Sequence, residues 1–248
     1  AVKAIAKEIR RPIIASLARC HPDDIDAAWE GVKGAERPRI HVFISSSDVQ
    51  ILHQLRKNPE EVMDMAVASV ERAKSYCEDV EFSPMDATRT DPEYLYKLVE
   101  AAIDAGAGVV NDVTALTGDQ DSLGLVADRG VAVVLMHMQG EPGSMQENPQ
   151  YENAAEDVFG TLKARFEACE EAGILRHRIA VDPGIGFGKT VDHNLEILNR
   201  LDIYRGLGLP VLLGVSRKSF IAKLSRGEAP KDRVPGSLAA VLSACAQG

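Results

Sequence analysis

The sequence predicts an α/β fold of the TIM-like (β/α) barrel type, with seven recognisable parallel strands. Short apolar, mostly β-branched runs recur along the 248 residues, and segments with helical patterns separate them. The runs begin roughly every 30 residues, as expected for one strand and one helix of such a barrel. Continuous apolar runs are also typical of strands buried on both faces of a parallel sheet. We therefore expect a single barrel-sized domain over residues 1–248.

The predicted strands share their apolar, β-branched character and cover residues 13–18, 40–45, 80–83, 108–111, 131–136, 179–182 and 211–215. Eight strands normally close this barrel, and one missing strand leaves two unpaired edges. The alternatives are an incomplete barrel, an irregular closure, or closure by seven strands alone. A second copy of the chain could cover the open edges, so we expect a homo-oligomer.

Helix starts are clearest in the first part of the chain. Asn58 and Asp91 each precede a proline and a glutamate, and Pro22 precedes two aspartates. Such residues satisfy free N–H groups and the helix dipole at a helix start. The predicted helices cover residues 22–29, 58–76 and 90–105.

Composition narrows the class of protein. A formal net charge of −9 and a pI near 5.2 argue against a general nucleic-acid or acidic-membrane surface. The four cysteines form no CxxC pair, as expected for reduced thiols in a cytoplasmic protein. The sequence has neither a membrane-length apolar run nor a signal-peptide pattern. Helical patterns at both termini suggest that both ends are cut.

The most informative stretch follows the run that ends at Asp182. Three glycines, Gly184, Gly186 and Gly188, come within the next six residues. Glycines let backbone N–H groups approach a flat or anionic ligand without interference from Cβ. The stretch therefore predicts a binding turn; it is not a phosphate-binding Walker loop, because the Gly-x4-Gly-Lys-Ser/Thr spacing is absent.

Four motifs occur in the order found in dihydropteroate synthase. They are Asn-Asp-Val at 111–113, Met-His-Met-Gln-Gly at 136–140, the turn after Asp182, and Ser-Arg-Lys-Ser-Phe at 216–220. Residues from about 105 to 248 thus resemble that family. The resemblance implies a transferase of folate biosynthesis that joins a dihydropterin pyrophosphate to 4-aminobenzoate. It implies no cofactor, apart from Mg²⁺ that could accompany the pyrophosphate.

The resemblance also implies roles for individual residues. Asp182 and Lys218 would be the catalytic pair that holds the pterin, Asn111 would bind its mixed donor and acceptor edge, and Met138 would pack on the ring. The remaining predicted substrate residues are Gly186, Phe187, Ser216 and Arg217.

Each of these side chains also has a simpler structural interpretation. Asp182 could cap the next helix, Asn111 could fix a loop, and Lys218 could be solvated. For one residue alone that interpretation is preferred, but four at matching strand ends favour a binding site. His137 is expected to be structural.

The first part of the chain, about residues 1–104, resembles 2-isopropylmalate synthase. The matching segments are 17–19, 23–29, 36–44 and 79–91. That family's metal site uses an Arg-Asp-Gly stretch and a His-x-His pair, and neither occurs here. Arg19, His41 and His53 remain, and we expect no metal site. Residues 101–107 are compatible with the sequence of either family, and they mark the expected junction of a hybrid or chimeric barrel.

Parts of the dihydropteroate synthase apparatus have no match. The resemblance implies two early loops and an Asp in the third strand near Ser83, but the sequence there resembles 2-isopropylmalate synthase instead. It also implies an Arg-x-His motif in an eighth strand, which would follow Gly248. Without them we expect a weak or inactive transferase. The alternatives are a 2-isopropylmalate-synthase-like acyl transferase of leucine biosynthesis and a catalytically silent hybrid scaffold.

Overall fold

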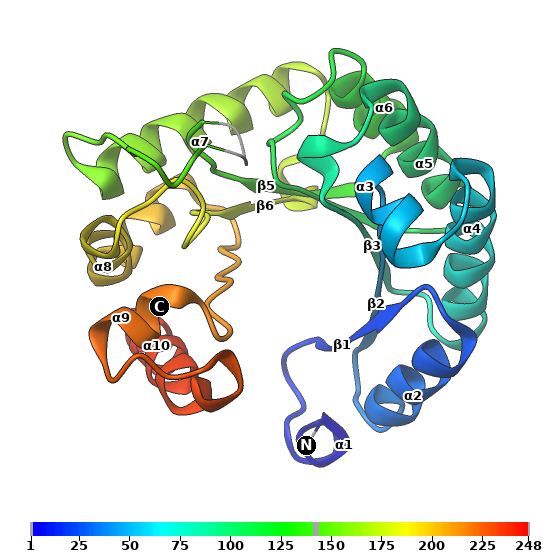
Figure 1. Cartoon of the computed structure of the whole chain (residues 1–248), viewed down its shortest axis with the longest axis horizontal. Coiled ribbons are helices and arrows are strands. Elements are labelled where there is room, and N and C mark those ends of the chain that lie inside the picture. Colours follow the sequence, from blue (N-terminus) through cyan, green and yellow to red (C-terminus); the bar gives the residue numbers. More distant parts are fainter. Residues whose placement is uncertain (1, 141–143, 248) are drawn as a thin grey trace. The chain divides into compact units, whose positions relative to one another are not determined.

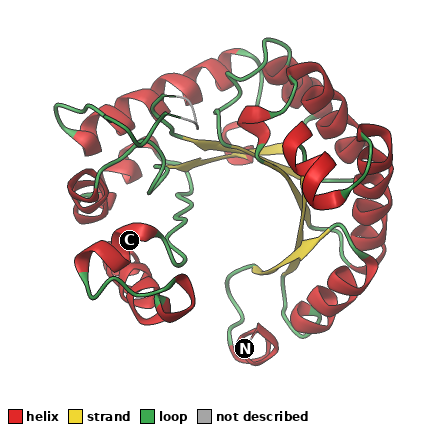
Figure 2. Ribbon diagram, in the orientation of Figure 1, coloured by secondary structure: helices red, strands yellow, loops and turns green. Residues whose placement is uncertain are grey.

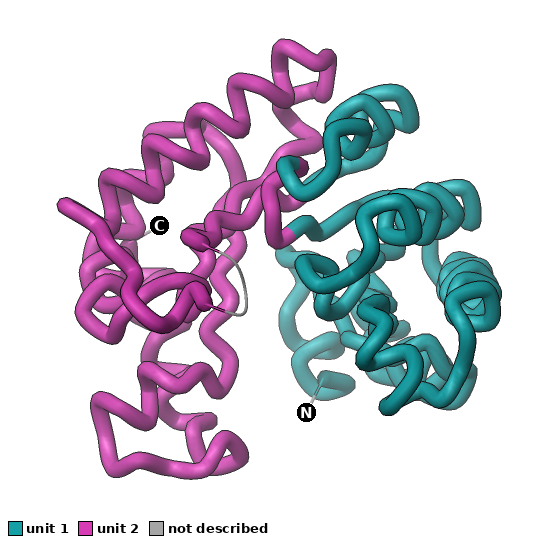
Figure 3. Tube along the Cα trace, turned by 45° about the horizontal axis from the view of Figure 1, so that its top comes forward, with its two compact units in different colours: residues 1–112, 117–133 teal, residues 113–116, 134–248 magenta. Residues whose placement is uncertain are grey.

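The computed structural model describes residues 2–140 and 144–247. It divides into two compact units, each described here by itself (Figure 3). Unit 1 comprises residues 1–112 and 117–133, and unit 2 comprises residues 113–116 and 134–248. Among the described residues, no helix has both the length and the apolar character needed to cross a membrane.

The sheet confirms the predicted α/β class, because strands and helices alternate along the chain (Figure 2). Strand order follows the sequence from β1 to β6. The strands are β1 (Ile14–Arg19), β2 (Pro38–Ser45), β3 (Val80–Met85), β4 (Val109–Asp112), β5 (Ala132–Met136) and β6 (Ile179–Asp182). Strands β1 to β4 pair in parallel.

The α-helices are α1 (Val2–Glu8), α2 (Pro22–Val32), α3 (Asp48–Gln50), α4 (Pro59–Tyr76), α5 (Pro92–Asp104), α6 (Ser122–Arg129), α7 (Ala154–Glu171), α8 (Val191–Asn199), α9 (Ser219–Leu224) and α10 (Val234–Gln247). Shorter helical segments cover Ile51–Leu55, Ala87–Arg89, Arg176–Arg178, Leu201–Leu207 and Pro230–Asp232. The three predicted helix starts are confirmed. At α4, for example, Asn58 accepts a hydrogen bond from Glu61 N, and the Glu61 carboxylate accepts one from Asn58 N.

In unit 1 the helices α2, α4 and α5 line the outer side of β1 to β3 (Figure 1). Ile40 and Val42 on β2 are fully buried toward these helices, because side chains alternate between the two faces of a strand. Their neighbours Arg39 and His41 therefore point to the opposite, inner face. Apolar burial against the helices holds the strands, and the inner face is left for polar groups.

In unit 2 the turn that follows β6 is held against the end of β5. His137 N, just after β5, donates to Asp182 O at 2.9 Å. The core of this unit is apolar and includes Val158, Leu162, Ile179 and Tyr204, all fully or almost fully buried.

The seventh predicted strand is much shorter than expected. Of residues 211–215, only Val211 forms a bridge, in parallel with Val181 of β6. Leu212 N donates to Val181 O at 2.8 Å, after which the pairing stops. Val211 itself is 38% exposed. The described residues thus form six strands and one isolated bridge, because only the first residues of 211–215 pair with β6.

Candidate binding site at the turn after β6

The glycine turn is shaped by close packing against the chain after β5. Gly184 has φ of 67°, and a Cβ there would lie 1.9 Å from His137 O. A Cβ on Gly188 would lie 2.3 Å from Gln139 O. Only glycine fits at these positions, since other residues clash and also avoid positive φ. Sequence reasoning assigned these glycines to approach of a ligand, whereas Gly184 and Gly188 make room for the protein's own backbone.

Asp182 is buried at the end of β6, with 6% of its surface exposed. Its Oδ1 accepts a hydrogen bond from Gly184 N at 2.7 Å. Burial raises the pKa of Asp182, and the Gly184 bond and the charges of Lys218 and Lys189 oppose that rise. The helix-capping alternative is wrong, because Thr190 caps α8.

Lys218 lies close to Asp182 and is half-buried rather than solvated. Its Nζ donates to Ile185 O and lies 4.4 Å from the centre of the Phe187 ring. A Cβ on Gly214 would lie 3.8 Å from Lys218 Nζ and 3.9 Å from Asp182 Oδ2. Desolvation lowers the pKa of Lys218, although the Asp182 charge opposes this. Asp182 and Lys218 thus meet beside Gly214, and the Phe187 ring lies next to the lysine.

Two further predicted site residues are Gly186 and Met138. Gly186 N donates to Asn194 Oδ1, and Gly186 O accepts from Gln146 Nε2, both at 2.7 Å. A Cβ on Gly186 would lie 3.1 Å from Lys218 Cδ, so this glycine makes room for the lysine. Met138 follows β5 and is partly buried.

Ser216 and Arg217 are exposed in the loop that carries Lys218. Arg217 N donates to Ser237 Oγ at 2.8 Å, and Arg217 O accepts from Arg233 at 3.0 Å. The loop is therefore tied to the start of α10. Asn111 lies in β4 of unit 1 and is partly buried; its role as a pterin ligand stays a prediction.

Sequence reasoning missed Lys189, which is only 3% exposed. Its Nζ lies 2.9 Å from His137 Nδ1 and donates to Phe187 O at 3.0 Å. Burial, followed by the charge of Lys218, lowers the pKa of Lys189 to about 7, although Asp182 opposes the shift. A lysine that directly follows the three-glycine turn is the signal that could have identified it.

His137 has the structural environment expected for it. Burial, and secondarily the charge of Lys189, lower the pKa of His137 to about 3. The ring is therefore neutral near pH 7, and its Nδ1 can accept a hydrogen bond from Lys189 Nζ.

Unit 1 carries a separate polar cluster on the inner face of β2 and β3. His41 Nε2 lies 2.6 Å from Ser83 Oγ, and His41 Nδ1 lies 3.4 Å from Glu81 Oε1. Arg39 contacts both carboxylate oxygens of Asp79, at 2.8 and 3.0 Å, and Glu81 at 3.2 Å. Burial lowers the pKa of His41, although Glu81 opposes this. These contacts hold neighbouring strands together.

Arg19 and His53, the two other residues considered for a metal site, lie outside this polar cluster. Arg19 pairs with Asp24 at the surface, and His53 is exposed. Within residues 2–140 and 144–247, no group of three or more His, Cys, Asp or Glu side chains could hold a metal ion.

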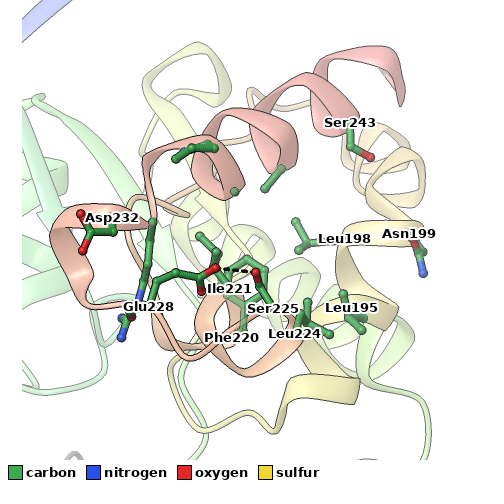
Figure 4. Close-up of a pocket in the computed structure, with 14 residues that line it drawn as sticks. Leu195, Leu198, Asn199, Phe220, Ile221, Leu224, Ser225, Glu228, Asp232 and Ser243 are labelled. Carbon is green, nitrogen blue, oxygen red and sulfur yellow. Dashed lines mark hydrogen bonds between the residues drawn. The ribbon is translucent and has the colours of Figure 1, made fainter.

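A mainly apolar pocket of about 380 Å³ lies elsewhere in unit 2, between α8, α9 and α10 (Figure 4). Its apolar wall includes Leu198, Phe220 and Leu224. At its polar rim Ser225 Oγ donates to Glu228 at 2.6 Å. None of its lining residues belongs to the group around Asp182.

Comparison with known families divides the chain at the predicted place. Residues 93–248 match the family model described as pterin binding enzyme, and residues 1–117 match the HMGL-like model. The two matches overlap at residues 93–117, which include the predicted junction. The hybrid character is thereby confirmed.

Curated relatives show the same division. The 2-isopropylmalate synthases of Clostridium kluyveri and Syntrophus aciditrophicus are 55% and 60% identical over 111 and 110 residues, covering 45% and 44% of this chain. The dihydropteroate synthase of Escherichia coli K12 is 38% identical over 152 residues, which is 61% of this chain. The matches span about a fifth of the former relatives (22% and 21%) and about half (53%) of the latter.

Solved structures of dihydropteroate synthases cover nearly the whole chain. The enzyme from Stenotrophomonas maltophilia, with imidazole in its active site, has a TM-score of 0.77 at 31% identity and covers 97% of this chain and 85% of its own. The Thermus thermophilus enzyme in complex with 6HMPPP gives the same values. Through residues 93–248 the chain belongs to the pterin binding enzyme family, and this part is joined to a first part similar to 2-isopropylmalate synthase.

Proposed function

We propose that the chain is a dihydropteroate-synthase-like transferase that binds a dihydropterin pyrophosphate at the turn after β6. The observation that carries this proposal is the buried carboxylate of Asp182, which lies beside Gly214 together with Lys218 Nζ. A pterin presents neighbouring N–H donors that a carboxylate accepts in pairs. Lys218 supplies a donor for the ring carbonyl or a ring nitrogen, and the Phe187 ring lies 4.4 Å from its Nζ.

The printed descriptions of structural relatives support the same ligand class. The Xanthomonas albilineans enzyme was solved with 7,8-dihydropteroate and with 4-aminobenzoic acid. In the proposed reaction the amine of 4-aminobenzoate attacks the methylene carbon of the dihydropterin. The bond from that carbon to the pyrophosphate oxygen breaks, the pyrophosphate keeps the electron pair, and the amine loses a proton to solvent.

Asp182 and Lys218 bind and orient the pterin in this proposal, and the exposed Ser216 and Arg217 border the 4-aminobenzoate side. Orientation of two reactants lowers the entropic part of the barrier. Stabilisation of a leaving pyrophosphate would need further cationic groups, and any Mg²⁺ would be held chiefly by the phosphate oxygens. Because the two early loops and the third-strand Asp that the resemblance implies have no match in this sequence, we propose binding with weak turnover.

Activity is tested by incubating the chain with dihydropterin pyrophosphate and 4-aminobenzoate and separating the product by chromatography. The matched variants are Asp182→Asn and the exposed Asp202→Asn of the same unit. The proposal expects slow product formation in the wild type and in Asp202→Asn and none in Asp182→Asn. Equal product in both variants would overturn the assignment of Asp182.

The alternatives make different predictions in the same preparation. Consumption of acetyl-CoA and 2-oxoisovalerate would favour an acyl transferase, although His41 is bonded to Ser83 and faces Glu81. Cooperative unfolding without pterin or aminobenzoate binding would favour a silent scaffold.

A further inference from the structure

Lys189 lies beneath the glycine turn and joins it to the chain after β5. We propose that Lys189 is the positioning residue of the pterin site, fixing the turn and supplying a second positive charge to Asp182. This inference rests on the proposed function, because it concerns the same ligand. Lys189 itself is buried at the inner side of the turn and is not assigned a contact with the ligand.

The contacts of Lys189 Nζ show what it fixes. The ammonium group donates to Phe187 O at 3.0 Å and to His137 O at 3.4 Å, and it lies 2.9 Å from His137 Nδ1. Phe187 carries the ring beside Lys218, and His137 directly precedes Met138. One buried group therefore holds the backbone next to two side chains that are predicted to touch the substrate.

The cost of burying a cation indicates that this arrangement has a purpose beyond packing. An unpaired buried charge is strongly unfavourable, so a buried lysine needs acceptors and an opposite charge. Gly184 leaves room for it, since a Cβ there would lie 3.4 Å from Lys189 Nζ. Asp182 provides the opposite charge, and its attraction favours the ionised form of Lys189.

The charged and titratable groups around Lys189 come from several elements. His137 follows β5, Asp182 ends β6, Lys218 precedes α9, and the Tyr151 ring centre is 5.9 Å from Lys189 Nζ. Among them Asp182 is the carboxyl group. Two lysines therefore favour its ionised form, which is the form that accepts hydrogen bonds from a pterin.

The first test needs no ligand. Amide hydrogen exchange at residues 184–188 is compared in the wild type, in Lys189→Met and in the control Lys223→Met, an exposed lysine on α9. We expect at least roughly tenfold faster exchange in Lys189→Met at this turn and no change in the control. Unchanged exchange at the turn would overturn the proposed positioning role.

The second test measures the affinity of a dihydropterin pyrophosphate analogue as a function of pH. Near pH 7 we expect Lys189→Met to bind roughly tenfold more weakly than the wild type. In addition, the pH below which binding is lost should move upward, because Asp182 then loses one of the two positive charges that favour its ionised form. A merely structural change would weaken binding evenly across pH.

A conservative variant keeps the test decisive if Lys189→Met does not fold. Lys189→Arg keeps the charge, so its binding should be lost at the same low pH as in the wild type, whatever its affinity. An upward shift in Lys189→Arg, or identical profiles for the wild type and Lys189→Met, would overturn the inference. If the wild type binds no pterin, the proposed function fails, and hydrogen exchange alone decides the role of Lys189 in the turn.

Discussion

The two units use buried charge in different ways. In unit 1 the Arg39 guanidinium is paired with Asp79 and Glu81 across neighbouring strands. In unit 2 the hydrogen bonds of Lys189 and Lys218 go to carbonyl oxygens and to His137, and the nearby Asp182 accepts from a backbone N–H. The first arrangement satisfies its charges with one another, as a structural cluster does. The second places a carboxylate and an ammonium group beside the same residue, Gly214.

This contrast has a thermodynamic side. Matched pairs hold strands together, whereas a buried carboxylate with a raised pKa and a buried lysine with a lowered pKa are groups whose charged forms are costly. Perturbed ionisation of this kind is concentrated at functional sites. The shifted pKa values of Asp182 and Lys189 therefore favour a functional role for the turn after β6.

The largest effect on stability is expected from Gly184→Ala. The new Cβ would meet His137 O, and φ of 67° is strained for alanine. Strain and clash together should lower the free energy of unfolding by about 3 kcal/mol or more in urea denaturation. Gly173→Ala is the matched control, since its φ is 92° but nothing lies within 4 Å of its Cβ, and about 1–2 kcal/mol is expected. Equal losses would show that the close approach to the chain after β5 is unimportant.

Arg39→Met tests the structural interpretation of the unit 1 cluster. It leaves Glu81, which is 5% exposed, without its guanidinium partner. We expect a loss of about 2–4 kcal/mol in the free energy of unfolding, with pterin affinity unchanged. Arg72→Met, which removes a more exposed pair with Asp26, should lower the free energy of unfolding by much less. A large fall in pterin affinity with Arg39→Met would remove the distinction between the two units.

The pH dependence of stability sharpens the same comparison. The pKa of Lys189 is lowered to about 7 in the folded protein, below its unfolded value of about 10.4. Between these values the unfolded chain binds more protons, so this group makes the free energy of unfolding rise with pH. The slope is at most about 1.4 kcal/mol per pH unit. Urea denaturation at several pH values above 7 should show this rise in the wild type relative to Lys189→Met; parallel profiles would contradict it.

Much of the fold could be predicted from the sequence, for physical reasons. Six of the seven predicted strands form, and each is an apolar, mostly β-branched run followed by a helical segment. The run at 211–215 has the same composition, but pairing depends on neighbours that composition does not reveal. Strand identity is thus a local property, whereas strand length is a tertiary one.

The candidate site shows the same limit. Asp182 and Lys218 could be predicted because a polar residue at a strand end and a recognisable motif mark them. Lys189 carries a weaker signal, its place directly after the three-glycine turn, and a lysine in a polar stretch normally predicts exposure. The function of Gly184 was also hidden, because its close neighbour, His137, is distant in the sequence. The surroundings of Lys189 and of Gly184 both depend on contacts between the ends of β5 and β6, which are distant in the sequence.

The most direct test of the account is a calorimetric titration with a dihydropterin pyrophosphate analogue. The wild type is compared with Asp182→Asn from the turn and His41→Gln from the unit 1 cluster. We expect saturable binding by the wild type and His41→Gln, and roughly a hundredfold weaker binding by Asp182→Asn, since a charge-assisted bidentate contact is lost. Binding by folded Asp182→Asn as tight as by the wild type, or no binding by the folded wild type, would contradict the proposed pterin site.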